Sequence, residues 1–151
     1  MAKLTKAHID AVQISLKVGR KEKQALFILL ASDGSINRLG SGAVNNRDQV
    51  LYIGKTEKPL FGKLMTRINN EFLSYMGGYE AEEIKGAVCE LMIQFRFVNG
   101  HANGFVYRYG ANAGGPPQPI CDFVNKAAEL TDPWHEEQKK LAGQKPWWQF
   151  W

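Results

Sequence analysis

Residues 89–98 alternate between apolar and polar side chains, and this pattern limits the fold more than any other part of the sequence. The apolar positions are Cys89, Leu91, Ile93, Phe95 and Phe97. A period of two is typical of a strand with one buried face. A second run, 105–109, follows a segment rich in Asn-Gly turn signals. We therefore expect a long antiparallel hairpin over 88–109.

The first third of the chain carries further strand signals. Residues 12–18 also alternate, and Ala25 to Ala31 is continuously apolar, as in a strand covered on both faces. Asp33-Gly34 supplies a tight hairpin turn before 36–39. A short strand is predicted over 50–54.

Two segments have helical spacing instead. Apolar residues recur every three or four positions from Phe61 to Met76 and again from Ile120 to Leu130. We expect Thr56 to cap the first helix and Gly77-Gly78 to end it. Asp132-Pro133 is predicted to end the second, with a short polar helix after it, because proline disfavours helix at the residue before it.

The order of strands, helix, hairpin and helix predicts an α+β fold. We expect a two-layer domain: a mainly antiparallel sheet of five to six strands, with two amphipathic helices packed on one face. A chain of 151 residues fits one domain, predicted over 5–131, with an aromatic-rich segment at 132–151 packing on the domain or on a partner. The uncovered face would be lined by polar strand residues: Gln13, Ser15, Lys17, Glu90, Gln94, Arg96 and Arg108.

The excess positive charge lies near the N-terminus. The whole chain carries +4, and residues 1–24 alone hold six basic and two acidic side chains. Clustered cations can bind phosphates by releasing counterions. The candidates for nucleic-acid contact are Lys17, Arg20, Lys21 and Lys23. The alternative is a solvated hairpin that these charges keep soluble.

Composition excludes several classes. Hydrophobic residues at 44% and charged residues at 23% exclude disorder. The longest apolar run, Ala25 to Ala31, is far shorter than a membrane span, and no export signal is evident, so we expect a cytoplasmic protein with no membrane contact. Two cysteines and three scattered histidines lack metal-ligand spacing, so we expect no metal site and no cofactor.

One stretch suggests chemistry. Tyr52-Ile53-Gly54-Lys55-Thr56 ends a predicted strand, and the helix after it carries Arg67. These residues resemble the second half of the GIY-YIG nuclease motif, whose first half is absent here. The resemblance implies that Tyr52 assists the attacking water, that Arg67 holds the scissile phosphate, and that Glu71 or Glu90 binds a divalent metal. An arginine suits that role because its planar guanidinium grips phosphate oxygens.

The C-terminal segment is the least ordinary part of the sequence. All four tryptophans lie in the last 18 residues. Tryptophan dominates the energetics of many interfaces, so the expected partner-binding residues are Trp147, Trp148, Phe150 and Trp151. The leading hypothesis is a non-enzymatic, self-associating binding domain that contacts a protein partner or a second copy through this segment. The alternatives are a metal-dependent nuclease and a weak nucleic-acid-binding module. A strap packed on its own domain would explain the same aromatic residues.

Overall fold

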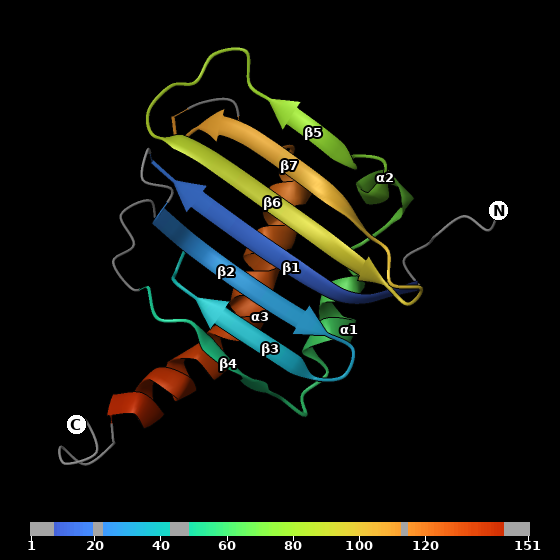
Figure 1. The fold of residues 1–151 in the computed structure, drawn as a ribbon, viewed down its shortest axis with the longest axis vertical. Coiled ribbons are helices and arrows are strands. Elements are labelled where there is room, and N and C mark those ends of the chain that lie inside the picture. Colours follow the sequence, from blue (N-terminus) through green and yellow to red (C-terminus); the bar gives the residue numbers. More distant parts are fainter. Residues whose placement is uncertain (1–7, 20–22, 43–48, 113–114, 144–151) are drawn as a thin grey trace.

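The alternating segments form the long central strands of a sheet. The computed structural model describes residues 8–19, 23–42, 49–112 and 115–143. The strands are β1 (Ile9–Val18), β2 (Lys23–Ala31), β3 (Ser35–Leu39), β4 (Tyr52–Lys55), β5 (Gly77–Glu80), β6 (Val88–Phe97) and β7 (Ala102–Gly110). Within this part of the chain they make one sheet in the order β4-β3-β2-β1-β6-β7-β5 (Figure 1).

The fold is a mixed α+β fold with a mostly antiparallel sheet, as predicted. The sheet has seven strands among the described residues, however, and the prediction of five to six was wrong. The extra strand is β5, which pairs in parallel with β7 while the other neighbours are antiparallel. Gly77 and Gly78, expected only to end a helix, are the first two residues of β5.

The segment predicted as one helix up to Met76 is two short helices. Helix α1 spans Leu60–Met65 and α2 spans Asn70–Leu73. The backbone N–H groups of Arg67 and Ile68 bond three residues back, which tightens and ends α1. The Asn69 side chain then accepts a hydrogen bond from the Phe72 N–H at 2.8 Å and caps α2. The apolar stripe survives the break, because Ile68 and Phe72 are both buried.

The C-terminal helix is longer than the sequence predicted. Helix α3 spans Gln118–Gly143 and contains Pro133, so the expected end at Asp132-Pro133 was wrong. Thr131 and His135, on either side of the proline, are both buried. Packing against the sheet therefore maintains the helix where local preference would stop it.

The core lies between the helices and one face of the sheet, behind the strands in Figure 1. Phe72, Phe95, Phe105 and Phe123 meet at its centre, with ring centroids 4.8–6.1 Å apart. They come from α2, β6, β7 and α3, so this aromatic cluster joins both layers. The helices leave the opposite face of the sheet open.

Candidate functional site

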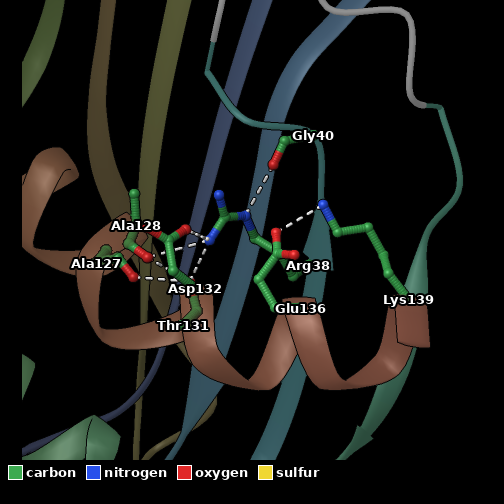
Figure 2. A network of polar contacts seen from close by, with 8 residues as sticks. All are labelled: Arg38, Gly40, Ala127, Ala128, Thr131, Asp132, Glu136 and Lys139. Atoms are coloured by element: carbon green, nitrogen blue, oxygen red, sulfur yellow. Dashed lines mark hydrogen bonds and ion pairs between the residues drawn. The ribbon is translucent and has the colours of Figure 1, made fainter. Parts of the chain in front are cut away.

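A buried arginine attaches α3 to the sheet (Figure 2). Arg38, on β3, is 2% exposed. Its guanidinium donates to the Gly40 carbonyl at 3.0 Å, the Ala128 carbonyl at 3.1 Å, Thr131 Oγ1 at 2.7 Å and Asp132 Oδ1 at 2.8 Å. Three of these four partners belong to α3, so the network determines where the middle of the helix sits.

The next turn of α3 packs on the edge strand β4. The Tyr52 and His135 rings meet edge-on, with centroids 5.6 Å apart. The Trp134 ring covers Gly54 so closely that a Cβ at this glycine would lie 2.9 Å from Trp134 Cζ2. One of the four tryptophans is therefore part of the domain's own packing.

Beyond this anchor, α3 extends past the β4 edge of the sheet (Figure 1). Leu141, near the helix end at Gly143, is 52% exposed. The predicted partner-binding residues Trp147, Trp148, Phe150 and Trp151 lie outside the described residues. Their assignment stays a prediction, and the structure supplies only the position from which the segment leaves.

Exposed apolar side chains gather on the same edge of the sheet. Val50 is 53% exposed, Leu51 42% and Ile53 71%. We call these three residues the edge patch. Monomeric proteins usually protect an edge strand with charge or with a covering element, so an exposed apolar edge is uncommon.

The open face of the sheet is apolar in its middle. By strand register, Leu39, Phe27, Ser15, Met92 and Val106 form one row across five strands. A parallel row runs from Ile53 of the edge patch through Asn37, Leu29, Gln13 and Gln94 to Gly104. The expected polar residues are on this face, but they alternate with large apolar ones.

One end of the open face is hollowed. Small residues there, Ala11, Gly100 and Ala102, lie between the longer side chains of Leu29, Gln13, Gln94 and Arg96. The hollow measures about 200 Å³. Arg96 is held at its rim, because its Nε donates to Asp10 Oδ1 at 2.8 Å.

The residues of the nuclease-like stretch have separate environments. Tyr52 packs on His135 of α3, whereas Arg67 is exposed in the turn between α1 and α2. Glu71 belongs to α2, but its side chain is not among those described. Glu90 lies on the open face of β6 beside Lys17 and Arg108. The catalytic assignment of these residues remains a prediction.

The N-terminal cations are only partly described. Lys17 is on the open face of β1 and pairs in register with Glu90. Arg20 and Lys21 lie outside the described residues, and Lys23 begins β2 with its side chain not described. Their role in nucleic-acid contact remains a prediction.

Burial shifts the pKa of several titratable groups among the described residues. No group of three or more His, Cys, Asp or Glu side chains in this part of the chain is arranged to hold a metal ion. Burial raises the pKa of the Cys89 thiol and of the Cys121 thiol, so both stay protonated and weakly nucleophilic. Burial likewise raises the pKa of Tyr107 to about 12. None of the described helices has the length and apolar character needed to cross a bilayer.

Sequence reasoning missed the buried role of Arg38 and the apolar row on the open face. Arg38 is two residues from Ile36, so alternation alone places it on the same face as a core residue. Phe27 and Leu29 were part of a continuous apolar run, which conceals the face that each residue occupies.

Comparison of the chain with protein-family models, curated proteins and solved structures finds no match.

Proposed function

We propose that this protein is a non-enzymatic binding domain that self-associates, with segment 144–151 as its contact element. The observation that supports the proposal most directly is the edge patch beside the projecting end of α3. An exposed apolar edge and an exposed Leu141 are found among the described residues, and the tryptophan-rich sequence follows Leu141 in the chain after Gly143.

The anchoring of α3 supports the same proposal. The Arg38 network and the Trp134 contact hold the helix against β3 and β4 on both sides of Pro133. A helix held in this way presents segment 144–151 from a defined position, which lowers the entropy lost when that segment binds a partner.

The aromatic content is sufficient for an interface. A large aromatic side chain buries about 150–250 Å², so Trp147, Trp148, Phe150 and Trp151 together could bury roughly 600–1,000 Å². A stable interface of standard size takes about 800 Å² from each partner. Segment 144–151 can therefore provide most of one side of a dimer contact.

The test is to end the chain after Gly143 and to measure its mass in solution by light scattering over a range of concentrations. The truncated chain keeps every described strand and helix, so its circular dichroism should be unchanged. We expect it to be monomeric where the full chain is oligomeric. A truncated chain that assembles as the full chain does, or a full chain that is monomeric throughout, would refute the proposal.

A matched pair of substitutions tests the edge patch. Ile53→Asp puts a charge on the proposed contact edge, and we expect it to weaken association at least tenfold. Ile84→Asp makes the same change at another exposed isoleucine, in the connection between β5 and β6 and away from the edge patch, and it should leave association unchanged. Equal effects of the two substitutions would remove the edge patch from the interface.

A further inference from the structure

We infer that the hollow on the open face receives an aromatic side chain from segment 144–151 of a second copy of this chain. The inference rests on the proposed self-association and says where the contact element binds. It identifies the face of the sheet opposite the helices as the receptor surface, whereas the edge patch alone would place the whole contact at β4.

The size of the hollow suits an aromatic ring. An apolar cavity of about 150 Å³ is large enough to bind benzene. The hollow has a similar volume, about 200 Å³, but it opens to solvent, so it has room for a ring or much of an indole entering from the open face. The hollow forms because Ala11 and Ala102 have small side chains. In the sheet register they are the two neighbours of Arg96, one on β1 and one on β7.

The chemistry of the walls suits tryptophan in particular. Leu29 supplies an apolar wall, and the amides of Gln13 and Gln94 can accept a hydrogen bond from an indole N–H. The Arg96 guanidinium, already oriented by Asp10, can lie over an aromatic face. An indole in the hollow would therefore make apolar contact with Leu29 and a hydrogen bond through its N–H.

The surroundings provide a path for the rest of the segment. The row from Ile53 through Asn37 and Leu29 leads from the edge patch to the hollow across adjacent strands. The parallel apolar row that contains Phe27 and Met92 lies beside it. An extended segment crossing this face would contact apolar side chains along most of its length.

The length of the segment favours a second copy over the same chain. From β4 to β6 there are four strand spacings, or about 19 Å, and passing from the helix layer to the open face adds about 10 Å. Trp147 and Trp148 reach at most about 18 Å from Gly143, and Phe150 and Trp151 reach about 25–29 Å only with a fully extended backbone. A path around the β4 edge adds to both spans the length by which α3 extends past that edge (Figure 1). The segment therefore falls short of the hollow of its own chain, whereas a second copy can bring its hollow to the segment.

The first test uses a labelled peptide of sequence 144–151 as the probe and the chain ended at Gly143 as the receptor. We expect saturable binding by fluorescence anisotropy. Ala102→Leu, which fills the hollow at an exposed position, should weaken binding at least tenfold. Ala87→Leu makes the same change at another exposed alanine and is the control. Peptide binding that Ala102→Leu leaves unchanged, or no binding at all, would overturn the inference.

A complementation experiment distinguishes a segment bound within its own chain from a segment bound to a second copy. The full chain with Ala102→Leu has the segment but a filled hollow, and the chain ended at Gly143 has the hollow but no segment. We expect each to be monomeric alone and the mixture to form a one-to-one heterodimer. The inference fails if the Ala102→Leu chain associates as the unsubstituted chain does, or if the mixture stays monomeric. Loss of association on truncation would still support the proposed function in that case.

Discussion

Replacing Arg38 by methionine tests whether the buried network attaches α3 to the sheet. The substitution removes all four hydrogen bonds of the guanidinium and leaves an apolar side chain of similar length. The Asp132 side chain is 58% exposed, so its carboxylate can return to water at little cost. The Gly40 carbonyl loses the guanidinium donor in a buried position, which is the main loss.

The expected change follows from these contacts. A buried acceptor that loses its partner costs about 1–3 kcal/mol, and hydrogen bonds to a charged group contribute about 1.5–3 kcal/mol each. Part of this loss is offset, because the variant no longer buries a charged guanidinium and because methionine adds apolar contacts. We expect Arg38→Met to lower the free energy of unfolding by about 3 kcal/mol. For a domain of this size the melting temperature would fall by about 6–12 °C.

The chain offers a matched control in Arg96. Its Nε lies 2.8 Å from Asp10 Oδ1, the same separation as between Arg38 and Asp132, but its side chain is 58% exposed. An exposed ion pair contributes about 0–1 kcal/mol, so Arg96→Met should change the stability by less than about 1 kcal/mol. Urea unfolding followed by circular dichroism measures both variants. Equal losses of stability would refute the argument that burial of Arg38 makes its network important.

Three further substitutions test the packing around α3 and β7. Gly54→Ala places a Cβ 2.9 Å from Trp134 Cζ2; it should cost about 1–3 kcal/mol and shift the fluorescence of Trp134 in the chain ended at Gly143. Unchanged emission would argue against this contact. Pro133→Ala supplies the N–H that proline withholds from the Glu129 carbonyl, and thermal unfolding should show a gain in stability of up to about 3 kcal/mol. A loss of stability would contradict this. The Tyr107 hydroxyl is buried and makes no hydrogen bond within the described residues, so Tyr107→Phe should be neutral or stabilising by about 1 kcal/mol. Because burial raises the pKa of Tyr107 from 10.0 to about 12, ionisation of its phenol disfavours the folded state: the stability of the protein is unaffected below pH 10 and falls as pH rises from 10 through 12. Alkaline unfolding of the phenylalanine variant should show a smaller loss of stability over that window.

The sequence predicted the elements whose periodicity is local. The hairpin of β6 and β7 follows from alternation in 89–98 and from the Asn-Gly turn, and β1 follows from the same rule. The uncovered face was predicted because one set of alternating side chains is polar. In these places local preference and tertiary packing agree, so sequence reasoning succeeds.

The errors occurred where tertiary contacts outweigh local preference. Pro133 is tolerated within α3 because Arg38 and β4 hold the helix on both sides of it. The break before α2 arises from the Asn69 cap, a short-range signal hidden within a regular apolar stripe. β5 has only four residues, two of them glycine, and depends on pairing with β7. A single sequence does not reveal such a partner.

The candidate site was only partly predictable for a related reason. Tryptophan clustering is visible in the composition, but the hollow exists only because Ala11 and Ala102 become neighbours of Arg96 through strands distant in sequence. The exposure of Ile53 depends on β4 being at the edge of the sheet. Edge position is a property of the strand order, which no local pattern specifies.

The central place of β1 has a consequence for synthesis of the chain. Strands β1 to β4 can pair as they leave the ribosome, but the other side of β1 must wait for β6, which begins 70 residues after β1 ends. At about 5–20 residues per second this interval is roughly 4–14 s. During that time the newly made half of the sheet presents β1 as an unpaired edge strand with one apolar face. Its first encounters, with its own later half or with another nascent chain, decide between folding and aggregation.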